Sequence, residues 1–290
     1  MRSHFTPASV GKKTMRSHFI SGAAIACAVT GAAALMPNTG LGQIASDTAN
    51  NYVNGAGGTW TDGSTGGYGF GAWSFSGTSG AGAGQQMAYS QPGGLNMWSL
   101  FNTGPGGIND VGRSITANGG LQVGQTFEAL IENPTAYHFY GGFDILFFNG
   151  TANYPAGTPD GTQPLTGIRA QVFGYYTHYP YWTVQDNGGG NQASTADSTA
   201  NNGVVQIDLT LNTATSYTLQ IGSSVVNGTL QSGTTINYVN FRNYRGGGSS
   251  GPNDTANNFQ IQYMEIVPEP ASMALLGLGL GGLLFFRRRK

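Results

Sequence analysis

The stretch from Val205 to Leu211 reads Val-Gln-Ile-Asp-Leu-Thr-Leu, so apolar and polar side chains alternate residue by residue. A β-strand places successive side chains on opposite faces, and this period of two is typical of a strand with one buried and one wet face. The same alternation marks residues 217–221 and 259–263. The pattern predicts antiparallel sheets, in which one face packs on a core and the other meets water.

Further stretches have the composition of short strands, and Gly, Asn, Asp and Ser fill the intervals between them. These residues favour turns because they tolerate positive φ. No amphipathic helix of useful length is visible between Ile44 and Val267. About ten short strands in roughly 220 residues predict two packed antiparallel sheets, and we expect an all-β jelly-roll sandwich over residues 44–266. The other candidate strands are 70–76, 97–102, 126–131, 138–148, 168–176, 181–185 and 236–241.

The composition is that of a folded domain rich in glycine turns. Glycine accounts for 48 of the 290 residues, and charged residues make up only 9%. Ordinary globular domains carry about 25% charged residues and about 7% glycine. Disordered chains also depart in this way, but they are poor in aromatic residues, which reach 11% here. We therefore assign the low-complexity stretch 54–84 to the sandwich; a solvated linker is the alternative interpretation.

The charge is distributed unevenly along the chain. Between Ile44 and Val267 there are 12 acidic residues against four arginines and no lysine, which leaves a net charge of −8. Such a domain repels nucleic acid, so we predict no nucleic-acid partner. Cys27 is the only cysteine and lies in the leader, which leaves the domain without a disulfide or a thiolate.

Residues 1–43 have the features of a secretory signal peptide. The pentapeptide at the N-terminus, Met-Arg-Ser-His-Phe, recurs from Met15, and basic residues precede an apolar run at 20–36. A short basic region followed by a short apolar core is typical of such leaders. Met15 is therefore the better start, and we expect cleavage between Gly40 and Ala45, with the bonds after Gln43 and after Ala45 as the preferred positions.

A permanent membrane anchor and a lipoprotein site at Cys27 are the alternative interpretations of this leader. The apolar run is short and the polar stretch Pro37–Gly40 follows it, which disfavours an anchor. The residue three places before the cysteine is Ala24 instead of the usual leucine, and apolar residues continue past Cys27. We therefore expect an exported protein.

The C-terminus consists of three parts in order. Pro268-Glu269-Pro270 is followed by an uncharged apolar run at 271–286, and four basic residues, 287–290, end the chain. The run predicts a transmembrane helix, although it would span only about 24 Å of a hydrocarbon core that is roughly 30 Å thick. The basic end stays cytoplasmic by the positive-inside rule, which places the domain at 44–266 on the other side of the membrane.

This tail, residues 267–290, resembles the PEP-CTERM sorting signal of Gram-negative bacteria. The resemblance implies recognition of the tripeptide by an exosortase, a membrane protease-transpeptidase, and removal of the tail with release or attachment of the protein at the cell surface. Proteins with this signal typically accompany exopolysaccharide production and biofilm or floc formation. An ordinary tail anchor with a proline-rich spacer is the alternative. The sorting-motif residues are Pro268, Glu269, Pro270, Arg287, Arg288 and Arg289.

The segment Gly69–Phe75, rich in glycine and aromatic residues, and the late strand before the tripeptide also resemble domains common among such sorted proteins. Those domains look like concanavalin-type lectin sandwiches. This second resemblance implies a shape and no binding residues.

The segment Phe173–Trp182 is dense in aromatic residues. We predict a hairpin with its turn at Thr177–Pro180. One buried face does not need so many rings, so some should be exposed, and flat aromatic side chains stack on sugar rings. Cross-strand pairing that only stabilises the hairpin is the alternative. The candidate carbohydrate-stacking residues are Tyr175, Tyr179, Tyr181 and Trp182.

Candidate catalytic and metal-binding groups are sparse. Glycoside hydrolysis needs two carboxylates about 5–9 Å apart, whereas Glu128 and Glu132 on one strand would be roughly 13 Å apart. Glu128 with Asp144 on a neighbouring strand remains conceivable. We predict no cofactor and no transition-metal site, and calcium would need loop carboxylates. The candidate loop aspartates are Asp160, Asp186, Asp197 and Asp254.

Three functions are compatible with these features. The first is a non-enzymatic surface or extracellular-matrix protein that engages extracellular polysaccharide. The second is a lectin-like carbohydrate-binding module with a defined sugar ligand, and the third is a secreted glycan-active enzyme. We expect the first, with an exosortase, the inner membrane before processing, and extracellular polysaccharide as partners.

Overall fold

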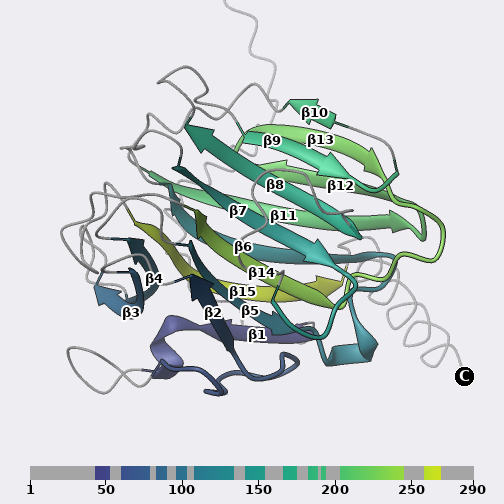
Figure 1. Cartoon of the computed structure of the whole chain (residues 1–290). Helices are drawn as coiled ribbons and strands as arrows, with labels where there is room; N and C mark the ends of the chain where they lie inside the picture. The colour runs from purple at the N-terminus through teal and green to yellow at the C-terminus, as the bar shows by residue number, and fades with distance from the viewer. Residues whose placement is uncertain are drawn as a thin grey trace, which may run out of the picture. The chain divides into compact units, whose positions relative to one another are not determined.

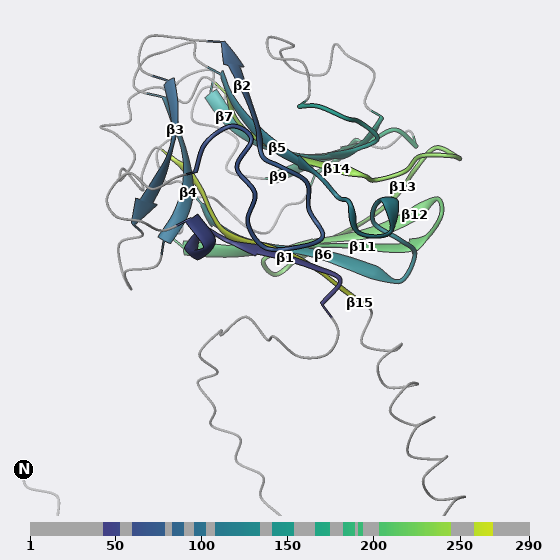
Figure 2. The same cartoon turned by 90° about the horizontal axis from the view of Figure 1, so that it is seen from below.

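The computed structural model describes residues 43–52, 60–78, 83–89, 96–102, 108–133, 141–153, 166–174, 182–188, 191–193, 203–244 and 258–268. These residues form fifteen strands and two 3-10 turns, η1 (Ala49–Tyr52) and η2 (Ala117–Gly119). The strands make two antiparallel sheets that lie face to face (Figures 1 and 2). The predicted all-β class and the division into two antiparallel sheets are confirmed.

One sheet has eight strands and lies behind the other in Figure 1. Its central strands are β6 and β15, and β1 joins the C-terminal half of β15. In order across the sheet, the strands are β13 (Ser224–Thr229), β12 (Ser216–Ile221), β11 (Gly203–Thr213), β6 (Gln125–Asn133), β15 (Phe259–Pro268), β4 (Asn96–Asn102) and β3 (Ala83–Tyr89), with β1 (Ala45–Thr48) paired to β15.

The other sheet has seven strands and faces the viewer in Figure 1. The chain passes between the two sheets several times, since β2 and β5 belong to this sheet whereas β3, β4 and β6 belong to the other. In order, its strands are β10 (Asn191–Ala193), β9 (Trp182–Asp186), β8 (Gly167–Gly174), β7 (Gly141–Phe148), β14 (Tyr238–Tyr244), β5 (Ile108–Ser114) and β2 (Ser74–Thr78).

The core lies between the sheets and is made by the apolar residues of the alternating pattern. In β11, Ile207 and Leu209 are buried in the main hydrophobic cluster, whereas Asp208 and Thr210 lie on the outer face and are half-buried. Phe241 of β14 enters the same cluster from the opposite sheet. The alternation that predicted strands therefore also identified which side chains meet in the core.

The low-complexity stretch contributes to this core. Trp60 is 2% exposed and Trp73 is 1% exposed, and their rings meet edge to face with centroids 5.2 Å apart. Trp98 of β4 packs against Trp73 at 4.9 Å. Where the structure describes it, the stretch 54–84 is thus part of the sandwich, and the linker interpretation is wrong for these residues.

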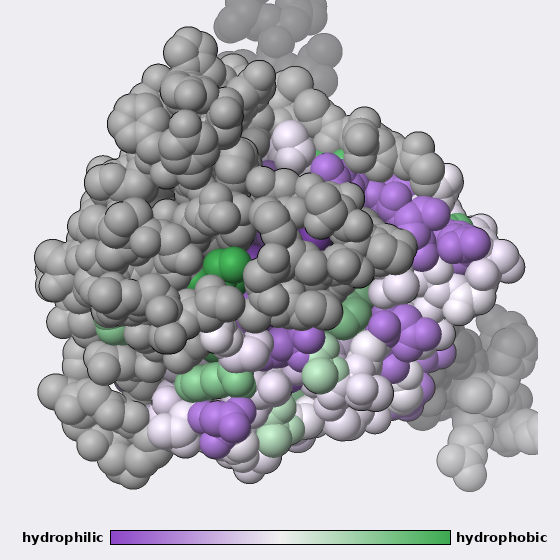
Figure 3. Space-filling model, viewed as in Figure 1, coloured by the Kyte–Doolittle hydropathy of each residue, from purple (hydrophilic) through white to green (hydrophobic). Residues whose placement is uncertain are grey.

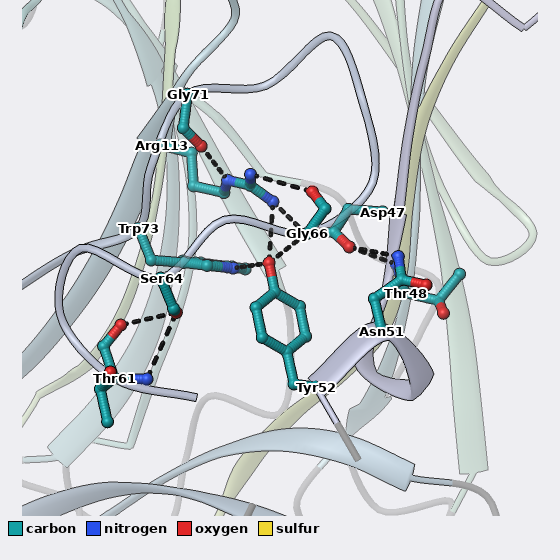
Figure 4. Close-up of polar contacts among 10 residues, drawn as sticks. All are labelled: Asp47, Thr48, Asn51, Tyr52, Thr61, Ser64, Gly66, Gly71, Trp73 and Arg113. Carbon is teal, nitrogen blue, oxygen red and sulfur yellow. Dashed lines mark hydrogen bonds and ion pairs between the residues drawn. The ribbon is translucent and has the colours of Figure 1, made fainter. Parts of the chain in front are cut away.

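A buried ion pair fastens the N-terminal segment to the sheets (Figure 4). The Arg113 guanidinium of β5 binds the Asp47 carboxylate of β1 and donates to the carbonyl oxygens of Gly71 (2.6 Å) and Gly66 (3.2 Å). The Tyr52 hydroxyl donates to Asp47 at 2.6 Å and accepts the Trp73 indole N–H at 2.8 Å. These contacts join β1, η1 and the loop before β2 to the seven-stranded sheet.

Within the described ranges, no helix is long and apolar enough to cross a membrane. The predicted helix at 271–286, the sorting residues after Pro268 and the leader before Gln43 lie outside the residues that the structure describes.

Candidate functional site

The structure places only part of the predicted carbohydrate-stacking surface. Tyr175, Tyr179 and Tyr181 lie outside the described residues. Trp182 is the first residue of β9, is 1% exposed, and belongs to the main hydrophobic cluster. A ring enclosed in the core has no free face for a sugar, so Trp182 does not fill the role that we predicted for it.

A row of polar side chains crosses the outer face of the seven-stranded sheet instead. Its members are direct cross-strand partners, and their sequence neighbours Val111, Phe241, Ile145 and Ala170 point to the opposite side, into the core. The row, which we call the charged row, consists of Ser76, Asp110, Arg242, Asp144, Gln171 and Thr183.

The centre of the charged row is an ion pair sealed from water. Arg242 Nε donates to Asp110 Oδ1 at 2.6 Å, and both side chains are almost completely buried. Burial raises the pKa of Asp110 to about 6, the Arg242 charge opposes that rise, and the nearby Asp144 carboxylate adds to it. Charged groups are rarely buried without a structural or functional reason, because removing each of them from water costs roughly several kcal/mol. The row is therefore a built feature of the sheet.

Further polar and aromatic groups lie beside the charged row on the same face. Leu146, Phe148 and Tyr238 form a small apolar cluster there, with the Phe148 and Tyr238 rings 5.3 Å apart. The Asn153 amide lies over the sheet, donates to Ser74 O at 2.7 Å, and accepts the Tyr238 hydroxyl at 2.8 Å. Figure 3 views the molecule from this side, and the coloured part of the surface mixes hydrophilic residues with neutral and hydrophobic ones.

This arrangement combines a buried polar network with half-buried polar groups on rigid strands. Arg242 and Gln171 carry N–H groups and Asp110 and Asp144 carry carboxylate oxygens, and all four side chains are buried, so they form the rigid framework of the face. The half-buried Ser76, Asn153 and Thr183 reach its surface. Polar groups in fixed positions beside apolar surface are the usual composition of a ligand site. We therefore take the outer face of the seven-stranded sheet as the candidate functional site.

The carboxylate pair that the sequence left conceivable is not formed. Glu128 lies on β6 and points outward from the eight-stranded sheet, whereas Asp144 lies on β7 in the charged row of the other sheet. The two side chains occupy opposite outer faces with the core between them. The glycosidase-like pairing of Glu128 with Asp144, which the sequence left conceivable, is therefore ruled out, since β6 and β7 belong to different sheets.

Glu128 instead stands between two other carboxylates. Its direct partners are Asp208 on β11 and Glu265 on β15, and we call these three residues the acidic row. Burial, reinforced by repulsion from both neighbours, raises the pKa of Glu128 to about 7. Burial likewise raises the pKa values of Asp208 and Glu265. The Gln43 side-chain amide donates to Glu265, and Gln206 donates to Asp208 at 2.7 Å.

In the described part of the chain, no three Asp, Glu, His or Cys side chains come together to hold a metal ion. Of the candidate loop aspartates, Asp186 accepts hydrogen bonds from Gly188 N, the Tyr217 hydroxyl and Thr229 N, at 2.9–3.2 Å. Its oxygens therefore organise a turn. Asp160, Asp197 and Asp254 lie outside the described residues.

The tail matches a known sorting signal. Residues 267–290 match the family model described as the PEP-CTERM protein-sorting motif. The chain ends in a PEP-CTERM motif. This motif indicates an exported protein, and its first two residues belong to the folded sheet, since Val267 pairs with Thr126 and Pro268 with Gln125. The PEP-CTERM tripeptide therefore begins at the last position of β15, with no spacer.

No curated protein shows significant sequence similarity to the chain. Solved structures with a similar arrangement of strands include the carbohydrate recognition domain of Emp47p (12% identity, TM-score 0.41, 68% of this chain and 88% of that one). The exoplasmic/lumenal domain of VIP36, solved with Ca²⁺ and Man3GlcNAc bound, has 12% identity and a TM-score of 0.43, over 68% and 83% of the two chains. A legume lectin-like domain from Entamoeba histolytica has 9% identity and a TM-score of 0.42, over 59% and 84%.

Sequence reasoning missed the charged row. A signal for Arg242 was present, because Val239 and Phe241 alternate with Asn240 and Arg242 at the end of a predicted strand. Asp110 had no such signal, since β5 reads Ile-Asn-Asp-Val-Gly-Arg-Ser and shows no period of two. The row itself depends on register between strands that are far apart in the sequence.

Proposed function

We propose that this protein is a non-enzymatic cell-surface or extracellular-matrix protein that binds extracellular polysaccharide through the outer face of the seven-stranded sheet. The observation that carries the proposal is the charged row. Its buried centre makes the face rigid, and its half-buried end members, Ser76 and Thr183, reach the surface of the sheet.

The chemistry of the site suits a polyhydroxylated ligand. Each sugar hydroxyl both donates and accepts, and the hydroxyls of Ser76 and Thr183 can do the same. The charged members of the row, two carboxylates and one guanidinium, are buried, so the face does not depend on a charged ligand.

The route to the surface follows from the PEP-CTERM motif. In this proposal an exosortase cuts at the tripeptide that starts with Pro268, and the tail from 271 to 290 holds the precursor in the inner membrane until then. The sandwich would be of jelly-roll type, because strands that follow one another in the chain repeatedly change sheets. A role in biofilm or floc formation would follow from binding of polysaccharide at that location.

A glycan-active enzyme is the less well supported alternative. The conceivable acid pair, Glu128 with Asp144, is divided between the two sheets. The Asp110 carboxyl has a raised pKa, but one of its oxygens is bound by Arg242 within the sheet. We therefore assign the charged row to recognition.

The test is a binding measurement with a matched pair of threonine variants. Thr183→Ala removes a half-buried hydroxyl at the end of the charged row, and Thr218→Ala makes the same change at a half-buried position of β12 in the other sheet. We expect Thr183→Ala to weaken binding about tenfold, the value of one or two lost hydrogen bonds, and Thr218→Ala to bind like the wild type. Affinity electrophoresis in gels containing dextran, alginate or the polysaccharide of the native host provides the readout.

Equal binding by both variants would place the glycan site elsewhere, and no retardation by any polysaccharide would refute a binding role. Release of reducing ends from one of these polysaccharides would favour the enzyme.

A further inference from the structure

The residues from Gln43 to Ala45 are built into the sandwich. Ala45 is 0% exposed and pairs with Ile266. The backbone N–H of Ile44 donates to Ile266 O at 2.8 Å. Gln43 reaches further across the sheet: its side-chain amide donates to the Glu265 carboxylate, and its Oε1 accepts the Tyr68 hydroxyl at 3.2 Å. The described fold thus begins at Gln43.

These contacts distinguish the positions at which the leader could be removed. A cut after Ala45 would delete a core residue and all the bonds above, and a cut after Gln43 would take the amide donor away from Glu265. A cut one residue earlier keeps every contact. The sequence immediately before Gln43 reads Gly40-Leu41-Gly42, and small residues three places and one place before the cut are what signal peptidases require.

We propose that the signal peptide is cleaved between Gly42 and Gln43, so that Gln43 is the first residue of the exported protein. In this hydrolysis one water adds across the peptide bond, which leaves a carboxylate on Gly42 and a free α-amino group on Gln43. The cut lies within the predicted range between Gly40 and Ala45, one residue before the cut after Gln43 and three residues before the cut after Ala45.

The new amino group also supplies a charge that the fold lacks at this place. The strands of the eight-stranded sheet contain no lysine or arginine, and the acidic row lies on their outer face. Cleavage at Gly42 creates an ammonium on the same residue whose side chain binds Glu265. A nearby positive charge favours ionised carboxylates, so removal of the leader offsets part of the repulsion within the acidic row.

The first test is mass spectrometry of the N-terminal peptide of the protein isolated from its native host. We expect a peptide that starts at Gln43 with a free α-amino group. A pyroglutamyl form locates the same cut, but it has neither the ammonium nor the side-chain amide that donates to Glu265, so it would contradict the electrostatic role. A peptide that starts at Ile44, at Ser46 or later, or an intact leader, would overturn the proposal.

A second test uses matched variants of the full-length precursor expressed in that host. Gly42→Trp puts a large side chain directly before the cut and should lower the processed fraction about tenfold. Leu41→Trp makes the same change at the tolerant position one residue earlier and should be processed as the wild type is. Cleavage at the proposed bond removes both residues, so the processed sandwich is the same in the two variants. Unchanged cleavage of Gly42→Trp, with the wild-type N-terminus, would contradict the assignment.

Discussion

At the scale of single residues, the sandwich contains ionisable groups in two opposite situations. Asp47 and Arg113 are buried together and satisfy each other through an ion pair and hydrogen bonds to Tyr52 and to backbone carbonyls. Glu128 is half-buried between two groups of its own charge. Removing Asp47 or Arg113 should therefore destabilise the folded protein, whereas removing the charge of Glu128 should stabilise it.

We expect Asp47→Ala to lower the free energy of unfolding by about 3–5 kcal/mol, because it leaves the Arg113 guanidinium buried without its counter-charge. Urea unfolding of the purified protein measures the change. Asn51→Ala is the control: it removes an exposed donor to the same carboxylate (2.7 Å) and should cost only about 1 kcal/mol. A loss below about 1 kcal/mol for Asp47→Ala would show that the ion pair does not hold the N-terminal segment.

Glu128 makes stability depend on pH. Its pKa is about 7 in the folded protein against an ordinary value near 4.3, so the folded state binds the proton more tightly than the unfolded state. The contribution to stability is complete below the ordinary pKa and is lost as the pH rises to about 7. We expect Glu128→Gln to remove this loss and to stabilise the protein at pH 8 by on the order of 1 kcal/mol, since partial exposure screens the repulsion.

Glu132→Gln is the matched control for this experiment, because Glu132 lies on the same strand and face but has Val204 and Gln260 as partners. Its pKa is raised by burial alone, so its effect should be the smaller one. Urea unfolding at pH 4, 6 and 8 gives the comparison. Equal pH dependence in the wild type and in Glu128→Gln would refute the role of the acidic row.

At the scale of elements, β5 shows how one strand positions the candidate site. Gly112 lies on its outer face between Asp110 and Ser114, and a Cβ there would come within 2.4 Å of Asn153 Oδ1, 2.6 Å of the Tyr238 ring and 2.8 Å of Val239 O. Because Gly112 has no side chain, the Asn153 amide and the Tyr238 ring can occupy the space above it. β5 therefore shapes the site in two ways: Gly112 leaves room for Asn153 and Tyr238, and Asp110 supplies a carboxylate.

We expect Gly112→Ala to displace Asn153 and Tyr238, to lower stability by about 1–3 kcal/mol through overpacking, and to weaken polysaccharide binding. Thermal unfolding and affinity electrophoresis measure the two effects. Ser114→Ala, on the same face two residues further along, should leave both nearly unchanged. Wild-type stability of Gly112→Ala would mean that this region of the face rearranges at little cost.

The strands with a clean period of two were predicted closely: residues 205–211, 217–221 and 259–263 lie within β11, β12 and β15. The other seven candidate stretches overlap β2, β4, β6, β7, β8, β9 and β14. β5 escaped prediction because its polar residues point both ways: Arg113 turns inward to Asp47, whereas Asp110 turns outward to Arg242. The burial of Trp182 and the separation of Glu128 from Asp144 depend on which sheet each strand joins. The sheet that a strand joins is determined by pairing between residues far apart in the sequence, and the local pattern of apolar and polar residues does not predict it.

At the scale of the whole molecule, the two places where the chain leaves the sandwich are adjacent. Ala45 at the start of β1 pairs with Ile266, and β15 ends two residues later at Pro268, the first residue of the tripeptide (Figure 2). The C-terminal half of β15 is bonded to β6 on one side and to β1 on the other.

This position of β15 has a mechanical consequence. A pull on the C-terminal end of β15 would act first on Val267 and Pro268, which pair with β6 alone. From Ile266 inward, the strand is paired on both sides, with β6 and with β1. A strand at the margin of a sheet separates by breaking one ladder of hydrogen bonds, whereas this part of β15 would have to break two at once.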